Sequence, residues 1–336
     1  MYDLLQNLNF GNVHIFNDKE LNFTAIIAIN SLRNGSAIGG CRCLVYENLE
    51  SAIVDAINLA HAMSNKSRLH DLPFGGAKSV IFLNKKATNK AQIMKKFGEF
   101  VDSLNGKYIA AVDSGTSPND MENIAKTTKH VLADSILGAV CNPSIYTAQG
   151  VFSSILGANS YLYSNNSIKH KKFLIQGVGA VGMSLAEKIY THGGELFVTD
   201  TNPDVLQIAK NKFNATVVTS LLDNQYDYFV PCALGGVLTK EICENIQTKI
   251  VIGAANNQFQ HPFAYYETLK NRNIYWVPDY LCNGGGLIHV VQQYQKLPVE
   301  FTATKIANIK QKTIDFLTLV DQNSSLSPKE ILNAIN

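Results

Sequence analysis

The feature that most restricts how this chain can fold is the hexapeptide Gly177-Val178-Gly179-Ala180-Val181-Gly182. It follows the apolar segment 173–175, which predicts a strand, and it opens residues 180–191, which predict a helix. The first glycine permits a tight turn, the second lets the backbone approach a phosphate, and the third lets helix and strand pack closely. The N-terminus of such a helix offers unpaired N–H groups and a positive dipole end to an anion. The motif therefore predicts a dinucleotide site.

Asp200 makes this prediction more specific. It ends the next predicted strand, 196–198, and lies 23 residues after Gly177, where a carboxylate accepts hydrogen bonds from the two hydroxyls of a ribose. Thr201 follows, and no arginine is near in the sequence, so NAD is favoured over NADP. A glycine turn with a helix-capping aspartate is the alternative, but it leaves the surrounding strand–helix–strand pattern without a role.

The remaining pattern predicts an α/β chain with two domains. After residue 145, further short strands are expected at 215–218, 228–230, 250–252 and 274–277, which is typical of a doubly wound Rossmann sheet. Before it, strands at 23–29, 79–83 and 108–112 alternate with helical segments, one of them capped by Asn48, and indicate a mostly parallel sheet.

We therefore expect an N-terminal α/β substrate and oligomerisation domain over 1–145 and an NAD-binding domain over 146–319. The cleft between them would hold the reaction, and the last helix, about 320–336, is expected to pack back on the first domain.

Composition excludes several other classes of protein. The 336 residues are 46% hydrophobic and 17% charged with a net charge of +2, so neither disorder nor nucleic-acid binding is expected. Neither a membrane span nor a secretory leader is found, and a soluble, cytoplasmic protein is expected. The six cysteines lack the paired spacing of zinc sites, so free, mostly buried thiols and no metal are expected; they are Cys41, Cys43, Cys141, Cys232, Cys243 and Cys282.

Three charged residues stand close to predicted sheet ends in the first domain. Lys66 lies at the end of an amphipathic helix, Lys78 follows Gly75-Gly76-Ala77 just before an apolar strand, and Asp113 ends the strand 108–112. Each alone is more often a surface charge. In a dinucleotide-binding chain, however, ligands bind at the carboxyl ends of the strands, which favours a site.

These residues lie within segments that together resemble the glutamate/leucine/phenylalanine/valine dehydrogenase family, most closely its leucine and phenylalanine branch. The resemblance covers most of the chain, and the matching segments occur in the family's order: Ala37–Arg42, Met63–Lys66, Leu72–Lys78, Asp113–Thr116, Thr147–Val151, Pro231–Gly235, Ala255–Gln258 and Pro278–Gly286.

The resemblance implies reversible, NAD-dependent oxidative deamination of an L-amino acid to a 2-oxo acid and ammonia. Lys66, with the backbone of Gly39 and Gly40, would bind the substrate carboxylate; Lys78 would activate water, and Asp113 would move protons at the amino nitrogen.

The resemblance also implies which residues line the cofactor and substrate sites. Asn257 would lie near the substrate amine. The side-chain pocket would be apolar and would exclude a carboxylate; it comprises Ile38, Met63, Ala111, Leu287 and Val290. The cofactor set would comprise Gly177, Gly179, Ala180, Val181, Gly182, Asp200, Thr201, Thr147, Cys232, Ala233, Ala255 and Asn256. A branched-chain or aromatic substrate and a homo-oligomer are expected.

Departures from the family pattern keep alternatives open. Ser64-Asn65, the stretch 67–71 and His289 differ from what relatives usually carry at these positions. A catalytically silent NAD- or amino-acid-binding homologue, acting as a sensor or assembly subunit, is therefore the main alternative. A nicotinamide enzyme for hydroxy acids would explain the glycine motif but not two lysines without a catalytic histidine.

Overall fold

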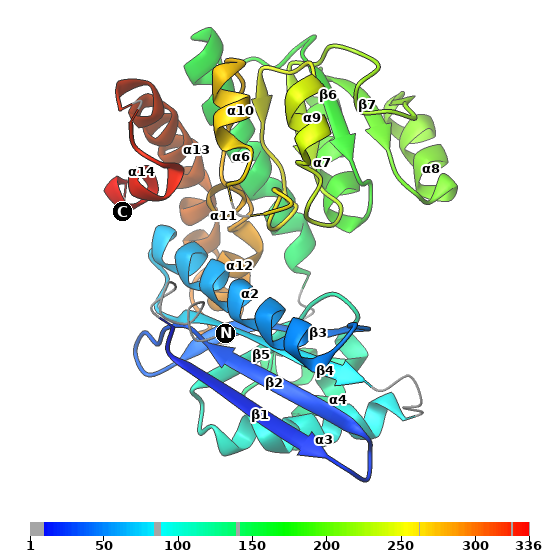
Figure 1. Ribbon diagram of the computed structural model, residues 1–336, viewed down its shortest axis with the longest axis vertical. Coiled ribbons are helices and arrows are strands. Elements are labelled where there is room, and N and C mark those ends of the chain that lie inside the picture. The colour runs from blue at the N-terminus through cyan, green and yellow to red at the C-terminus, as the bar shows by residue number, and fades with distance from the viewer. Residues whose placement is uncertain (1–9, 84–88, 139–141, 262, 324, 336) are drawn as a thin grey trace. The chain divides into compact units, whose positions relative to one another are not determined.

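The computed structural model describes residues 10–83, 89–138, 142–261, 263–323 and 325–335. Its contacts divide the chain into two compact units, Met1–Cys141 with Gln293–Lys296, and Asn142–Gln292 with Leu297–Asn336. Each unit is a sheet covered by helices (Figure 1), as predicted for a two-domain α/β chain. The predicted limits at 145 and 319, and the return of 320–336 to the first domain, stay predictions.

The described part of the first unit contains a five-stranded mixed sheet. Its strands in spatial order are β1 (Asn12–Asp18), β2 (Phe23–Ile29), β4 (Gly75–Leu83), β3 (Ala37–Leu44) and β5 (Tyr108–Val112). β3 pairs in parallel with both β4 and β5, whereas β1–β2 and β2–β4 are antiparallel. The prediction of a mostly parallel sheet is therefore wrong, since the short turn 19–22 folds β1 and β2 into a hairpin, which must be antiparallel.

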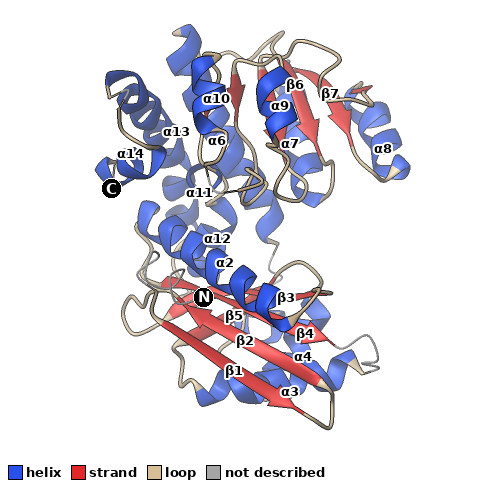
Figure 2. Ribbon diagram, viewed as in Figure 1, coloured by secondary structure: helices blue, strands red, loops and turns tan. Residues whose placement is uncertain are grey.

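Helices cover both faces of this sheet (Figure 2). α2 (Leu49–Leu69) begins after Asn48, whose side chain accepts a hydrogen bond from the Ser51 N–H as the sequence predicted. Its apolar stripe packs on Ile26, Ala28 and Val80. Alternate residues of β2 point to the other face, where they pack with α3 (Lys90–Ser103) and α4 (Pro118–Ala125) in a second core; the short α5 (Asp134–Leu137) follows.

The described part of the second unit contains a six-stranded sheet in which every pairing is parallel. Its spatial order is β11 (Tyr275–Trp276), β10 (Ile250–Val251), β9 (Tyr228–Pro231), β6 (Lys172–Gln176), β7 (Glu195–Thr199) and β8 (Thr216–Val217). Counted from β6, this is the doubly wound order of a Rossmann sheet, and the order reverses between β6 and β9. Ligands of such sheets bind outside the strand ends at this reversal.

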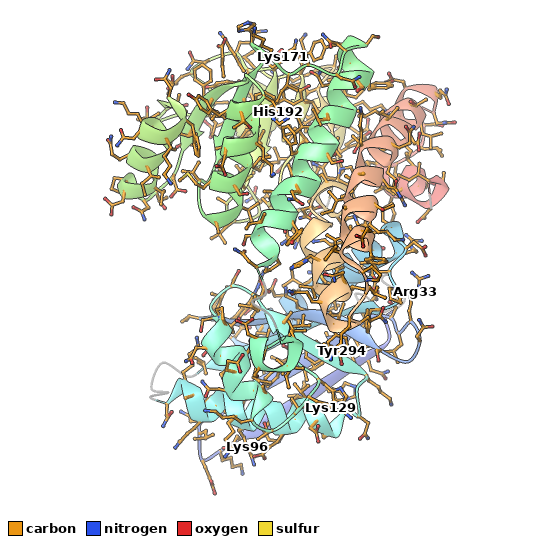
Figure 3. The ribbon with its side chains drawn as sticks, turned by 180° about the vertical axis from the view of Figure 1, so that it is seen from behind. Arg33, Lys96, Lys129, Lys171, His192 and Tyr294 are labelled. Carbon is orange, nitrogen blue, oxygen red and sulfur yellow. The ribbon has the colours of Figure 1, made fainter. Side chains whose placement is uncertain are left out.

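Helices lie on both faces of the second sheet as well (Figures 1 and 3). α6 (Pro143–Tyr163) and α7 (Ala180–Thr191) lie on one face, and α9 (Lys240–Asn245) and α10 (Tyr266–Asn271) on the other. The remaining helices among the described residues are α8 (Pro203–Phe213), α11 (Asp279–Cys282), α12 (Gly285–Tyr294), α13 (Val299–Gln322) and α14 (Pro328–Ala334).

α13 packs along α6, and Gly157 permits this because a Cβ there would lie 2.4 Å from the Lys310 carbonyl oxygen. α14 packs on α13 within the same unit. Among the described residues, no helix has the length and apolarity that a bilayer span requires. The five described cysteines are free thiols, and Cys141 lies outside the described residues.

Candidate functional site

The register of three neighbouring strands brings Lys78 and Asp113 together in the first unit. Cys41 of β3 pairs with Ser79 of β4 and with Val112 of β5. Lys78 of β4 therefore lies beside Gly40 of β3. Asp113 directly follows β5, which pairs with the opposite edge of β3. Their side chains meet in an ion pair between Lys78 Nζ and Asp113 Oδ2.

Lys78 lies inside a strand that is longer than the sequence indicated. β4 begins at Gly75 instead of residue 79, so the glycines before Lys78 belong to the sheet. A Cβ on Gly75 would lie 1.9 Å from the Ser31 carbonyl oxygen, and one on Gly76 would lie 2.0 Å from the backbone nitrogen of Ser64 on α2. Gly76 thus lets α2 approach the strand that carries Lys78, and Gly75 lets the 31–32 segment approach it.

Gly40 gives the Asp113 side chain its space. A Cβ on Gly40 would lie 2.7 Å from Cβ of Asp113 and 3.1 Å from its Cγ. A Cβ on Gly39 would lie 1.7 Å from the Ala77 carbonyl oxygen, while the Gly39 carbonyl accepts a 2.9 Å hydrogen bond from the buried Tyr108 hydroxyl. Both glycines are therefore required by close approach, and any side chain on Gly40 would push the carboxylate away from Lys78.

A tight turn fixes the backbone of Asp113. Its N–H donates to Thr116 Oγ1 over 2.9 Å, and the Thr116 hydroxyl lies 2.9 Å from the Cys41 carbonyl on β3. Gly115 adopts φ +79° and its Cα lies so close to β3 that a Cβ would be 1.7 Å from the Cys43 carbonyl oxygen. The turn 113–116 is thus attached to the strand that also carries Gly40.

The electrostatics keep the Asp113 carboxylate ionised. Burial alone would raise the pKa of Asp113, but the Lys78 ammonium and the Arg42 guanidinium outweigh it, so this pKa is lowered. Lys78 is 6% exposed, so the ion pair lies in a largely water-excluded position. A buried acid–base pair of this kind can exchange a proton with a bound molecule.

The last turn of α2 carries Lys66, which is 9% exposed. The stretch 67–71 is mostly buried where α2 ends: Leu69 and His70 are 1% and 2% exposed, and the Ser67 hydroxyl donates to the Phe74 carbonyl. Only Arg68 and Asp71 are exposed there. Ser67, Leu69 and His70, which depart from the family pattern, are therefore part of the packing next to Lys66.

The apolar pocket residues of the first unit lie around the same strands. Ile38 of β3 is 1% exposed and pairs with Gly76 of β4, and Ala111 of β5 pairs with Gly40. Met63 lies on α2 at the point where this helix approaches Gly76. The structure therefore brings these three residues to the strands that carry the Lys78–Asp113 pair. Leu287 and Val290 lie on α12 in the second unit and are both buried.

The glycine loop of the second unit has the geometry of a phosphate-binding turn. Gly177 adopts φ +94°, and a Cβ there would lie 2.6 Å from Ala233, so the turn after β6 passes close to the loop after β9. A Cβ on Gly182 would lie 2.0 Å from the Gly177 carbonyl oxygen, which brings α7 against the turn. At Gly179, the N-cap of α7, a Cβ would meet no atom within 4 Å. The open side of the turn thus lies where a pyrophosphate approaches a helix N-terminus.

Asp200 ties the end of β7 to this glycine turn. One carboxylate oxygen accepts the Val178 N–H over 2.8 Å, and the other accepts the Asn202 N–H over 2.9 Å. Each carboxylate oxygen can accept a further hydrogen bond. Thr201 is exposed beside it, as are Ala180 at the start of α7 and Ala233, while Val181 and Cys232 are half-buried.

The loop that contains Ala255, Asn256 and Asn257 is held by side chains from α11 and its end. The Asn257 N–H donates to Asp279 over 2.8 Å, and the Asn283 side-chain amide donates to Asn256 Oδ1 over 2.9 Å. Ala255 is buried, and its N–H donates to the Pro231 carbonyl. Both asparagine side chains are exposed in this loop, so their amides are accessible to a ligand.

Thr147 lies in the first turn of α6, where its hydroxyl donates to the Pro143 carbonyl over 3.0 Å. Gly286 of α12 faces it, since a Cβ on Gly286 would lie 2.4 Å from Thr147 Oγ1. The neighbouring Tyr146 stacks on His289 with ring centroids 3.6 Å apart, and burial lowers the pKa of His289. His289 therefore packs α12 on α6 and presents a neutral ring at neutral pH.

Several supporting residues were not expected from sequence. Arg42 forms an ion pair with Asp113, and Asp279 and Asn283 hold the 255–257 loop. Side chains alternate along a strand, so Arg42 lies on the same face of β3 as Gly40. This alternation is the sequence signal that could have placed Arg42 near Asp113. Within the described ranges, no group of three His, Cys, Asp or Glu side chains could hold a metal ion.

Comparison with known proteins agrees with this geometry. A model of the Glu/Leu/Phe/Val dehydrogenase dimerisation domain matches residues 9–130, and one of the glutamate/leucine/phenylalanine/valine dehydrogenases matches residues 198–314. A phenylalanine dehydrogenase of Lysinibacillus sphaericus is 35% identical over 300 residues, which cover 87% of this chain and 78% of that protein. The chain belongs to the glutamate/leucine/phenylalanine/valine dehydrogenase family. It is thus an amino acid dehydrogenase by family, an oxidoreductase acting on a CH–NH2 group. The family and the enzyme class predicted from the sequence are therefore confirmed.

Two further members of this dehydrogenase family are similar along most of the chain. A leucine dehydrogenase of Thermoactinomyces intermedius is 32% identical, with coverage of 94% of this chain and 86% of that protein. The crystal structure of L-tryptophan dehydrogenase from Nostoc punctiforme superposes with a TM-score of 0.83 at 30% identity and covers 100% of this chain and 97% of its own. The two-domain α/β fold expected from the sequence is therefore also confirmed.

Proposed function

We propose that this dehydrogenase catalyses the reversible, NAD-dependent oxidative deamination of an apolar L-amino acid to its 2-oxo acid and ammonia. The observation that carries the proposal is the buried Lys78–Asp113 pair next to Gly39 and Gly40 on β3. A positioned lysine amine, in its neutral form, would supply the base, and the neighbouring carboxylate would supply the proton carrier that this reaction requires at one carbon atom. Members of the family named for phenylalanine, leucine and tryptophan support an amino acid as substrate.

The residues of the second unit fit NAD. Gly179 leaves open space at the N-terminus of α7, where pyrophosphate oxygens would accept backbone hydrogen bonds. Asp200 is oriented by Val178 and Asn202 and has capacity left for ribose hydroxyls, whereas a 2′-phosphate would meet its negative charge. Thr147, Asn256 and the 232–233 turn would hold the nicotinamide end. When bound, NAD accepts the α-hydride of the amino acid.

The chain's own residues then have separate roles. Lys66, buried at the end of α2, would bind the substrate carboxylate together with the backbone of Gly39 and Gly40. Lys78 Nζ would take a proton from the attacking water, and Asp113 would carry protons to and from the substrate nitrogen, near Asn257. These roles require both units to face one cleft, which is part of the proposal. Exclusion of water from this cleft would then protect the hydride step.

An apolar side chain is proposed for the substrate because the pocket residues are apolar. Ile38, Met63 and Ala111 of the first unit and Leu287 and Val290 of the second offer no partner for a carboxylate, and an unpaired buried charge is costly. A homo-oligomer is proposed as well, supported by the match of residues 9–130 to a dimerisation domain.

The deciding experiment mixes purified protein with NAD and a panel of L-amino acids at alkaline pH and follows the near-ultraviolet absorbance of reduced nicotinamide. The panel contains leucine, valine, phenylalanine and tryptophan, with glutamate and a 2-hydroxy acid as controls. Turnover of an apolar amino acid but not of the two controls is expected. Tight NAD binding without turnover of any amino acid would contradict the proposal and favour the catalytically silent homologue.

Lys78→Ala tests the assignment within the first unit. Loss of an essential acid–base group costs about 10²–10⁴-fold in rate, so kcat is expected to fall in this range while NAD affinity stays unchanged. Lys96→Ala is the matched control, because Lys96 lies on α3 and pairs with Glu99 at the surface (Figure 3). Loss of NAD binding in Lys78→Ala, or normal turnover, would contradict the role given to Lys78.

A further inference from the structure

Arg42 is the charged side chain next to Asp113 that the proposed reaction leaves without a role. Its Nε lies 3.5 Å from Asp113 Oδ2, and its side chain is only 18% exposed. β3 carries both Arg42 and Gly40, the residue against which the Asp113 side chain packs. Arg42 and Lys78 thus approach the same carboxylate oxygen from two neighbouring strands.

A second carboxylate and a tyrosine hold the other end of the guanidinium. Arg42 Nη1 donates to Asp55 Oδ2 over 3.0 Å, and the Tyr46 hydroxyl donates to the same oxygen over 2.6 Å. Asp55 lies in the second turn of α2, so this network links the helix to β3 and to the turn after β5. The guanidinium is thus hydrogen-bonded to Asp55 and ion-paired with Asp113, and its planar group is more preorganised than a flexible ammonium.

Two charged side chains lie at the Asp113 carboxylate, and two buried residues nearby respond to its charge. Lys78 on β4 and Arg42 on β3 are cationic, while Cys41 on β3 and Tyr108 on β5 are buried neighbours whose pKa values are raised by burial first and also by the charge of Asp113. With Asp55 included, the cluster has two cations and two carboxylates. Removal of Arg42 would leave Lys78 as the one cation in this set and would leave Asp55 without its guanidinium.

We propose that Arg42 is a positioning residue for the dehydrogenase reaction: anchored by Asp55 and Tyr46, it holds the Asp113 carboxylate in place and in its ionised form beside Lys78. The inference rests on the role proposed for Asp113 and adds the residues that make this role possible. Arg42 does not contact the substrate in this proposal; it acts through Asp113 alone.

The test compares Arg42→Met, Arg42→Lys and Asp55→Asn in the full-length protein, by kcat and KM over a pH series with the amino acid turned over best. A displacement of about 1 Å can cost about 10²-fold in rate, so Arg42→Met is expected to lower kcat about 10–100-fold. Because the guanidinium favours the ionised carboxylate, the acid-side decline of activity should move to higher pH in Arg42→Met. Lys at this position keeps the charge and should restore the acid side of the profile.

Asp55→Asn separates position from charge. It releases the anchor but leaves the positive charge of Arg42, so kcat should fall while the acid-side decline does not move to higher pH. Lys96→Met serves as the control for a cation lost elsewhere in the same unit. Binding of the reduced nicotinamide cofactor and far-ultraviolet circular dichroism establish that each variant is folded. If Arg42→Met does not fold, Asp55→Asn still tests whether the anchored guanidinium positions the Asp113 carboxylate.

Two results would overturn the inference. One is a folded Arg42→Met whose kcat and pH profile match the wild-type protein while its melting temperature alone falls, which is a purely structural role. The other is a normal kcat in Asp55→Asn. Asp113→Asn distinguishes this failure from failure of the proposed function: it should be nearly inactive if Asp113 acts as proposed, whatever Arg42 does, and full activity in it would refute the proposed function itself.

Discussion

Gly40→Ala gives the sharpest test of the idea that β3 sets the position of the Asp113 carboxylate. The added methyl would lie 2.7 Å from Asp113 Cβ and 3.1 Å from Cγ and Oδ2. Carbon atoms in contact are normally about 3.5–4.0 Å apart, so the Asp113 side chain must withdraw by about 1 Å. Such a shift costs about 10²-fold in rate, equivalent to about 2.7 kcal/mol of transition-state stabilisation.

The assay measures kcat, the KM for the amino acid, and the affinity for reduced nicotinamide by fluorescence. We expect kcat to fall about 100-fold, the nucleotide affinity to stay unchanged because the residues proposed to bind it lie in the other unit, and stability to fall by about 1–3 kcal/mol from overpacking. Gly179→Ala is the stability control, because its methyl would meet no atom within 4 Å. A folded Gly40→Ala with kcat within about twofold of wild type would refute the reasoning, since twofold corresponds to only about 0.4 kcal/mol.

Three further predictions concern the second unit. Gly182→Ala places a methyl 2.0 Å from the Gly177 carbonyl oxygen. NAD binding, measured by calorimetry, should be lost while the protein stays folded. Retained affinity for NAD would contradict the packing role of this glycine. Burial lowers the pKa of His289 from 6.5, so its contribution to stability is present above pH 6.5 and is lost as the pH falls below this value. His289→Gln should therefore flatten the plot of melting temperature against pH in this range. An unchanged slope would contradict this role of His289. The Thr313 hydroxyl donates to the Ile309 carbonyl, so the Ser154 hydroxyl must donate to Thr313 over 2.7 Å. Ser154→Ala should lower the free energy of unfolding, measured in urea, by about 1 kcal/mol. No change in this free energy would refute the prediction.

The local elements were predicted well because their causes are local. The helix over 180–191 and the strand over 108–112 were predicted with the bounds that the structure has, since hydrophobic periodicity and glycine breaks act within a few residues. Asn48 was identified as the cap of α2 for the same reason. The doubly wound type of the second sheet was also predicted, because parallel strands joined by helices leave few possible topologies.

The first sheet was predicted less well because its pairings join distant segments. β2 and β4 pair antiparallel although about 50 residues separate them, and nothing in either strand's own pattern encodes direction. The start of β4 at Gly75 was missed for a related reason: two glycines indicate a turn in sequence, whereas here they permit close approach of α2 and the 31–32 segment. The burial of Ser67, Leu69 and His70 likewise depends on what packs over them.

What the sequence by itself determined is the set of chemical groups and their local settings: a glycine turn that opens a helix, a carboxylate at the end of the next strand, and two lysines and an aspartate near strand ends. Only the tertiary structure decided which of them meet. Lys78 and Asp113 form a pair because the register of β4, β3 and β5 brings them to the two sides of Gly40, and Arg42 joins them because alternate residues of β3 face one side. Register is a property of several strands together, so no single segment of the chain contains it.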